Sequence, residues 1–325
     1  MKILVRLPNW LGDMIMSVAF IRQLEKVYPG AEISIIVKEG LQPLLHWFPK
    51  IKHQFVFSKK RYKGLRGAYR FGKFISSKET FDLFFCLPDS FSAAVMGFAT
   101  GAKSRIGYRN EFRNNLLTKS FSKRKSIHRV ETYTDLLEFF SGKKTEIFSV
   151  QLENKGTINN EVVININSEA SSRRLPLEKA ISLINKIRAQ INNEILLTGS
   201  PAEKHFVDSV FNALNNKSGI QNIAGKTGIN ELAEIISHAK LVLSTDSGIA
   251  HLGNAFGVYT IVLFGAGNEN KTAPHNKEKC TVIRLGELSC EPCENNICKR
   301  FGTPKCLTLL DDQRITDEVL KHCDQ

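Results

Sequence analysis

The residues with the clearest chemical potential form a short polar turn between two apolar runs, Ser244-Thr245-Asp246-Ser247-Gly248. The runs, residues 241–243 and 260–264, have the length and β-branched content of buried parallel strands. The turn therefore joins the carboxyl end of a strand to the start of a short helix. A helix start offers free N–H groups and a partial positive charge, which favour a phosphate. Asp246 or Ser247 can equally cap the helix, so both interpretations stay open.

A second candidate carboxylate, Asp13, ends the loop Pro8-Asn9-Trp10-Leu11-Gly12-Asp13, which follows an apolar run. At the mouth of a cleft, a carboxylate can act as a general base and take a proton from an attacking hydroxyl. At a helix start, the same residue can serve as an N-cap instead. Spacing alone favours the cap.

Four cysteines near the carboxyl end follow the pattern C-x2-C-x4-C-x7-C, namely Cys290, Cys293, Cys298 and Cys306. Four thiols packed this closely can hold a tetrahedral metal ion such as zinc. The spacing is not that of a standard zinc finger, and reduced cysteines packed in a loop are the alternative. A structural metal is therefore a hypothesis for this segment.

The predicted elements alternate between strands and helices along the whole chain. Strands are expected at residues 2–7, 33–37, 81–87, 162–165 and 194–197, and helices at 14–27, 177–190, 229–237 and 315–322. This alternation is typical of doubly wound α/β sheets. A polar stretch, residues 153–160, predicts a linker. We therefore expect two domains, residues 1–155 and 156–325, facing a cleft, with the last helix packing back across them.

Composition limits the class of protein and of partner. The 325 residues are 42% apolar and 24% charged, which is ordinary for a globular protein, but the formal net charge is +13. Such an excess indicates an anionic partner. Residues 58–74 are basic with interleaved aromatics, which is typical of a nucleic-acid or membrane-surface patch, or of a solvated basic face. The amino terminus lacks the long apolar core of a signal peptide, so we expect a cytoplasmic location.

Several motifs, taken in order, resemble the ADP-heptose:lipopolysaccharide heptosyltransferases of glycosyltransferase family nine. The opening RLPNWLGDMIMSVAFIRQLEKVYP is similar to the family's amino-terminal signature. The likeness continues through RIGY, RNNLLT, the run from His128 to Tyr133, SSRRLP and, most clearly, STDSGIAHLGNAFG. It covers nearly the whole chain and includes the cysteine run.

The resemblance implies a GT-B architecture, in which two Rossmann-like domains bind acceptor and sugar nucleotide respectively. It implies inverting, metal-independent transfer of heptose from ADP-L-glycero-D-manno-heptose to the lipopolysaccharide inner core, with Asp13 as base. Arg173 stands where members commonly carry a lysine. The implied donor-binding residues are Arg173, Glu203, Thr245, Asp246, Ser247, Gly248, Ile249 and His251. The implied acceptor-binding residues are Asn9, Trp10, Gly12, Arg105 and Arg113.

The expected partners are ADP-heptose and an anionic acceptor, either Kdo–lipid A or a heptosylated core. The expected site of action is the cytoplasmic face of the inner membrane, with peripheral contact and no nucleic acid. The PNWLGD wording favours the enzyme that adds the second heptose. Three alternatives stay open: another acceptor, such as an outer-core sugar or a protein; another sugar nucleotide; and a non-catalytic nucleic-acid-binding protein, for which only the charge and residues 58–74 argue.

Overall fold

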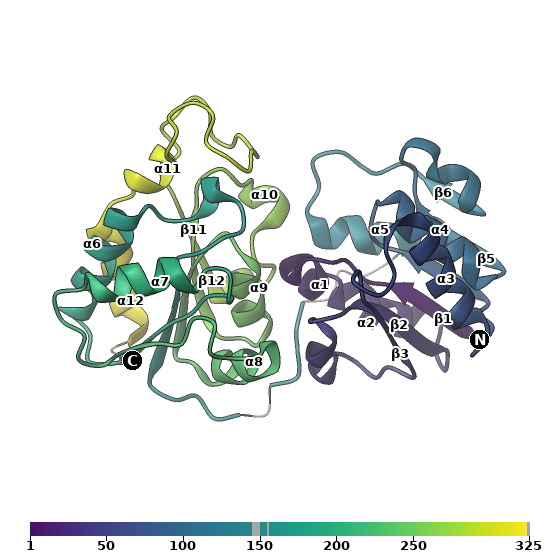
Figure 1. Ribbon diagram of the computed structural model, residues 1–325, viewed down its shortest axis with the longest axis horizontal. Coiled ribbons are helices and arrows are strands. Elements are labelled where there is room, and N and C mark those ends of the chain that lie inside the picture. The colour runs from purple at the N-terminus through teal and green to yellow at the C-terminus, as the bar shows by residue number, and fades with distance from the viewer. Residues whose placement is uncertain (145–149, 155, 324–325) are drawn as a thin grey trace. The chain divides into compact units, whose positions relative to one another are not determined.

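The computed structural model describes residues 1–144, 150–154 and 156–323. The chain divides into two compact units, Met1–Glu153 and Asn154–Gln325 (Figure 1). The division falls at the start of the predicted linker, and residue 155, on which the predicted boundary rests, lies outside the described residues.

The first unit is built on a six-stranded parallel sheet in the order β3-β2-β1-β4-β5-β6. Its strands are β1 (Lys2–Arg6), β2 (Glu32–Lys38), β3 (Gln54–Phe57), β4 (Leu83–Cys86), β5 (Ser104–Tyr108) and β6 (Lys119–Phe121). The central strands β1 and β4 are apolar on both faces because helices cover both sides of the sheet. This is the strand order of a dinucleotide-binding fold.

The helices of the first unit are α1 (Leu11–Met16), α2 (Val18–Val27), α3 (Gly64–Ser76), α4 (Phe91–Thr100) and α5 (Arg129–Ser141). The prediction of a single helix over residues 14–27 is therefore wrong. The helical segment begins at Leu11 and is divided into α1 and α2 at Ser17. The Ser17 hydroxyl donates to the Met14 carbonyl at 2.6 Å, a local bond that competes with the regular helical ladder.

The second unit repeats the same topology with an unrelated sequence. Its parallel sheet has the order β12-β11-β10-β7-β8-β9, which matches the first sheet strand for strand. The strands are β7 (Glu161–Asn165), β8 (Glu194–Leu197), β9 (Ile220–Asn222), β10 (Leu241–Thr245), β11 (Tyr259–Phe264) and β12 (Cys280–Arg284). The prediction of two doubly wound parallel sheets is confirmed.

The helices of the second unit are α6 (Leu177–Arg188), α7 (Lys204–Asn212), α8 (Ile229–His238), α9 (Gly248–Ala255), α10 (Glu269–Thr272), α11 (Lys305–Thr308) and α12 (Asp312–Cys323). The buried side chains of α12, Ile315 and Val319, belong to the core formed by β7, β10 and α6. Its apolar face thus belongs to the core of the second unit, and packing against the first unit stays a prediction.

In each unit the strand order reverses at one point, between β1 and β4 and between β7 and β10. The loops that leave these neighbouring strands run to opposite faces of the sheet, which opens a crevice at their carboxyl ends. The turn with Asp13 follows β1, and the turn with Asp246 follows β10. Both candidate carboxylates therefore lie at the reversal point of their own sheet.

Candidate active site

Asp13 lies in the first turn of α1 and does not cap it. The N-cap is Trp10, which makes no side-chain cap. The Asp13 side chain is 25% exposed, and its Oδ1 accepts a hydrogen bond of 3.2 Å from the Tyr133 hydroxyl and lies 3.4 Å from Nε of Arg129. A partly exposed carboxylate that is fixed by two donors can still accept a further proton from a ligand.

The two partners of Asp13 come from α5. Arg129 and Tyr133 are four residues apart, so they share one face of that helix. Burial, followed by the Asp13 charge, raises the pKa of Tyr133 well above its ordinary value, so the phenol stays a hydrogen-bond donor at neutral pH. Sequence reasoning assigned neither residue a role, although the i, i+4 spacing of a cation and a phenol was the available signal.

A buried arginine shapes the loop between β1 and α1. Arg6 is 2% exposed, and it donates to the carbonyls of Leu7 and Ile36 at 2.7 and 3.2 Å and to the Asn9 side-chain oxygen. Burial lowers its pKa to about 10, so it remains charged at neutral pH. Asn9 is thus held by Arg6, while Trp10 is 56% exposed with Lys38 Nζ 5.6 Å from its ring centre.

Two further predicted acceptor residues, Arg105 and Arg113, are committed to the fold of the first unit. Arg105 donates to the carbonyls of Leu116 and Ala102 at 2.9 and 2.8 Å. Arg113 is 1% exposed and donates to the Pro88 carbonyl at 2.7 Å. Arg105 thus holds the amino end of β5, Arg113 holds the segment that follows β4, and Arg113 presents no surface to a ligand.

In the second unit, the turn after β10 is tied to the end of β7. Ser247 is the N-cap of α9, and its hydroxyl accepts from the Ile249 N–H at 3.3 Å. The Asn165 side-chain amide donates to the hydroxyls of Ser247 and Ser244 at 2.8 and 3.1 Å. The amide thus joins the two strands that flank the reversal point. Sequence reasoning missed Asn165, a polar residue at the very end of an apolar strand.

Thr245 supports this turn from inside. It is fully buried, and its hydroxyl donates to the Asn167 carbonyl at 2.5 Å. His251, on α9, is 7% exposed, whereas Gly248 and Ile249 are half-buried at the helix start. The accessible part of the predicted donor loop is therefore the first turn of α9.

Asp246 is a buried carboxylate paired with a cation. It is 5% exposed, and its Oδ2 lies 3.3 Å from Nη1 of Arg173, whose side chain is 29% exposed. Burial raises the pKa of Asp246 above its ordinary value, against the opposing effect of Arg173. A Cβ at Gly267 would collide with Oδ2, so this position needs glycine. Asp246 is thus an anchor for Arg173 rather than the helix cap.

Glu203 lies at the start of α7, beside the turn that follows β8. Its carboxylate accepts a hydrogen bond of 2.8 Å from the Ser200 N–H, and the residue is half-buried. One carboxylate oxygen, Oε2, is thus bound to its own loop, while the side chain keeps contact with solvent. The geometry leaves acceptor capacity for a ligand hydroxyl.

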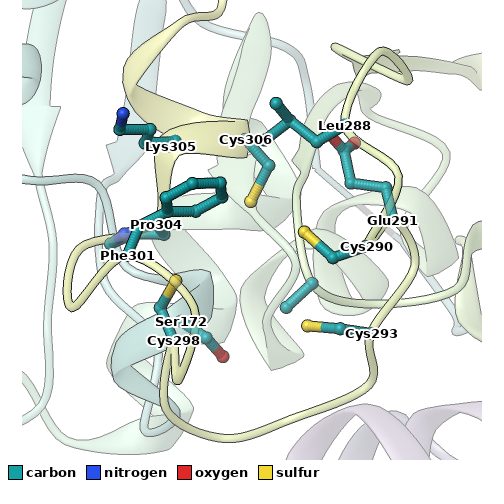
Figure 2. A pocket seen from close by; sticks show the side chains of 11 residues that line it. Ser172, Leu288, Cys290, Glu291, Cys293, Cys298, Phe301, Pro304, Lys305 and Cys306 are labelled. Atoms are coloured by element: carbon teal, nitrogen blue, oxygen red, sulfur yellow. The ribbon is translucent and has the colours of Figure 1, made fainter.

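The four carboxy-terminal cysteines line one small pocket. Figure 2 shows the sulfur atoms of Cys290, Cys293, Cys298 and Cys306 directed into this pocket, which has a volume of about 20 Å³. That volume holds about one water-sized particle. Burial and the neighbouring acidic groups raise the pKa of Cys306 to about 11. In the described residues, however, no group of three or more His, Cys, Asp or Glu side chains is arranged to hold a metal ion.

Comparison with known families decides the class of protein. The family model described as glycosyltransferase family 9 (heptosyltransferase) matches residues 69–301. The chain belongs to glycosyltransferase family 9. It is therefore a glycosyltransferase, as predicted from the motifs.

Relatives of this family 9 chain match it over most of their length. It is 23% identical to lipooligosaccharide heptosyltransferase 2 of Campylobacter jejuni, over 99% of both chains. It is 26% identical to lipopolysaccharide heptosyltransferase 2 of Escherichia coli K12, over 88% of both chains. The solved structure of E. coli ADP-heptose LPS heptosyltransferase II superposes with a TM-score of 0.84 at 23% identity, over 100% of this chain and 99% of that one. The GT-B fold is thus confirmed.

None of the helices in 1–144, 150–154 and 156–323 combines the length and apolar composition needed to cross a bilayer.

Proposed function

We propose that the chain transfers L-glycero-D-manno-heptose from ADP-heptose to the inner core of lipopolysaccharide, as the enzyme that adds the second heptose. Family 9 membership and the names of the relatives support the donor and acceptor classes. The observation that carries the reaction type is Asp13, a partly exposed carboxylate held between Tyr133 and Arg129 at the carboxyl end of β1. An inverting transfer needs one such base.

In this mechanism, Asp13 removes the proton of the acceptor hydroxyl as that oxygen attacks the anomeric carbon of heptose. The bond from the anomeric carbon to the diphosphate oxygen breaks on the opposite face, and ADP leaves with the electron pair. Tyr133 and Arg129 keep the carboxylate oriented, since Tyr133 donates a hydrogen bond to Oδ1 and Arg129 forms an ion pair with it. General base catalysis by a positioned carboxylate contributes about 10²- to 10⁴-fold to the rate.

The second unit provides positive potential for the leaving diphosphate. The proposed phosphate site is the start of α9, where Gly248 permits close approach and the end of the helix carries a partial positive charge. Arg173 supplies a full charge, held in place by Asp246. These groups stabilise charge that develops as ADP departs, and the mechanism assigns no step to a metal. Glu203 accepts hydrogen bonds from the nucleotide ribose.

The acceptor meets the first unit at the loop after β1. Trp10, with an exposed ring, and Asn9 and Gly12 beside it, are proposed to contact the sugar that carries the attacking hydroxyl. The protein is proposed to act at the cytoplasmic face of the inner membrane, where a lipid-anchored acceptor is presented.

A second candidate function is supported by a further relative. The chain is also 25% identical to lipopolysaccharide heptosyltransferase 3 of E. coli K12, over 78% of this chain and 80% of that protein. A heptosyltransferase that serves another core position uses the same donor site and base. The acceptor is the only difference between the two proposals.

The deciding experiment measures ADP release from ADP-heptose with truncated lipopolysaccharides that carry no heptose, one heptose or a completed inner core. Release only with the one-heptose acceptor supports addition of the second heptose. Release only with bare Kdo–lipid A or with the completed core moves the assignment to the first or a later position. Absence of release with all three, despite ADP binding, would contradict the proposed function.

For the cysteine pocket we propose a structural metal ion, bound by Cys290, Cys293, Cys298 and Cys306. Its four inward-facing sulfurs are a suitable donor set, although their described arrangement is not that of a formed site. Elemental analysis of the purified chain tests it. About one equivalent of zinc or iron, lost in Cys290→Ser/Cys293→Ser, supports the hypothesis, and a small fraction of an equivalent contradicts it.

A further inference from the structure

The segment from Lys59 to Lys78 carries eight cations and no acidic residue. The cations are Lys59, Lys60, Arg61, Lys63, Arg66, Arg70, Lys73 and Lys78, all of them exposed. In the described part of the chain, none of them forms an ion pair with a carboxylate. We call this surface, together with the exposed side chains of Leu65, Tyr69 and Phe74, the basic face.

The buried side of α3 packs on the unit, so the opposite side, which carries the basic face, points away from it. Gly67, Ala68, Phe71, Gly72 and Ile75 are buried, and a Cβ at Gly72 would collide with the Met96 carbonyl of α4. The helix is therefore pressed against α4 by its small and apolar residues. Its opposite side is left to solvent, as the position of α3 at the outside of the first unit in Figure 1 also indicates.

The exposed side of α3 is amphipathic in its own right. Leu65 and Tyr69, and Arg66 and Arg70, are pairs four residues apart, so they form adjacent rows along the helix. Leu65, Tyr69 and Phe74 are 50%, 44% and 44% exposed. A helix that combines such apolar side chains with lysine and arginine fits the interface of an anionic bilayer.

Two aromatic residues of the segment, Tyr62 and Phe71, pack inside the unit. The rings of Tyr62 and Phe71 pack on each other, with centroids 4.9 Å apart, and Phe71 also packs on Phe57 at 5.2 Å. They are thus used inside the unit and do not form a row of free rings on which bases stack. Leu65, an exposed aliphatic residue at the start of α3, gains nothing from a base or a phosphate chain, which favours a bilayer over a nucleic acid.

We infer that the basic face docks the first unit on the surface of a bilayer that contains anionic phospholipids. The cations meet lipid phosphates, and Leu65, Tyr69 and Phe74 enter the headgroup region. Each lysine or arginine near such a surface strengthens binding several-fold. This inference rests on the proposed function for its biological use, because a lipid-anchored acceptor lies in the same bilayer.

The test compares two triple variants with the same net charge. Arg66→Gln/Arg70→Gln/Lys73→Gln neutralises the centre of the basic face. Lys119→Gln/Lys217→Gln/Lys226→Gln neutralises three exposed lysines elsewhere. Partitioning of the full chain is measured on vesicles of phosphatidylcholine with 30% phosphatidylglycerol and on phosphatidylcholine alone, at several salt concentrations, after equal thermal stability has been verified.

The basic-face variant is expected to bind the anionic vesicles at least about tenfold more weakly, whereas the control changes by less than about twofold. Leu65→Gln/Tyr69→Gln is expected to bind the anionic vesicles several-fold more weakly. This loss should remain at high salt, because it concerns apolar contacts. Equal losses in both triple variants, or no binding of the unaltered chain to anionic vesicles, would overturn the inference. Binding to single-stranded RNA that depends on the basic face, without vesicle binding, would replace the bilayer with a nucleic acid.

Heptose transfer to a deacylated, water-soluble acceptor separates this inference from the proposed function. The basic-face variant is expected to keep this transfer within about twofold. A large loss would place the basic face in the acceptor site and overturn docking as its role. If the unaltered chain transfers no heptose at all, the proposed function fails while the vesicle result still decides the inference.

Discussion

The two units share one strand order, yet their strand-to-helix turns place a carboxylate in opposite environments. Asp13 is 25% exposed and lies between a phenol and a guanidinium. Asp246 is 5% exposed and faces one guanidinium, with a raised pKa caused by burial. Asp13 follows the first strand of its sheet and Asp246 the fourth strand of the other, so the two sides of the same reversal point support two different chemical roles.

Solvent contact explains the difference. A carboxylate at the surface of a turn can exchange a proton with a ligand, whereas a buried one stabilises the cation beside it. In the first unit the donors come from α5 and leave Asp13 accessible. In the second unit Gly267 and Arg173 enclose Asp246.

The largest effect is expected for Asp13→Asn. This change keeps the shape of the side chain but removes its capacity to take a proton, so kcat for heptose transfer should fall by about 10²- to 10⁴-fold. ADP affinity, measured by calorimetry, should stay within about twofold, because the donor site belongs to the second unit. Near-normal turnover would remove Asp13 from the role of base and erase the contrast with Asp246.

Arg173→Met is expected to lower the stability of the fold as well as the affinity for the donor. It leaves the buried Asp246 carboxylate without its cation, which should lower the free energy of unfolding by about 1–3 kcal/mol. Adding Asp246→Asn should recover most of that loss, because no buried charge remains. Chemical denaturation of the single and double variants measures the coupling. If the double variant is no more stable than Arg173→Met, the pair is not the anchor described above.

Tyr133→Phe should reduce kcat by about tenfold, the equivalent of one hydrogen bond of about 1.4 kcal/mol to a charged group. Phe139→Leu, on the same helix but 37% exposed and without contact to Asp13 in the described structure, serves as the control. Near-normal kcat in Tyr133→Phe would reduce Tyr133 to a packing role.

The smallest effect concerns the pH dependence of stability. The folded chain binds the Asp246 proton more tightly than the unfolded chain does, since burial raises the pKa above the ordinary 3.8. This residue's contribution therefore becomes less favourable as the pH rises from about 4 through the folded pKa. Asp246→Asn should flatten the stability profile in that window, as measured by thermal melting. A steeper dependence of stability on pH in the variant would contradict the raised pKa of Asp246.

The amino-acid sequence determined the local structure of this protein. Apolar runs such as those of β1 and β10 identify buried strands, and the polar turns between runs locate Asp13 and Asp246 at strand ends. These signals are readable because strand and helix periodicities involve only near neighbours. The motif order was enough to predict the family, which the family model confirmed.

Only the tertiary structure decided which groups meet. Tyr133 lies 120 residues from Asp13 in sequence, and Asn165 lies 82 residues from Ser247, yet both pairs are hydrogen-bonded. The tertiary structure also buried Arg113 and made Ser247 the cap in place of Asp246. Such contacts depend on strand order and on packing summed over the whole unit, and no local periodicity encodes them.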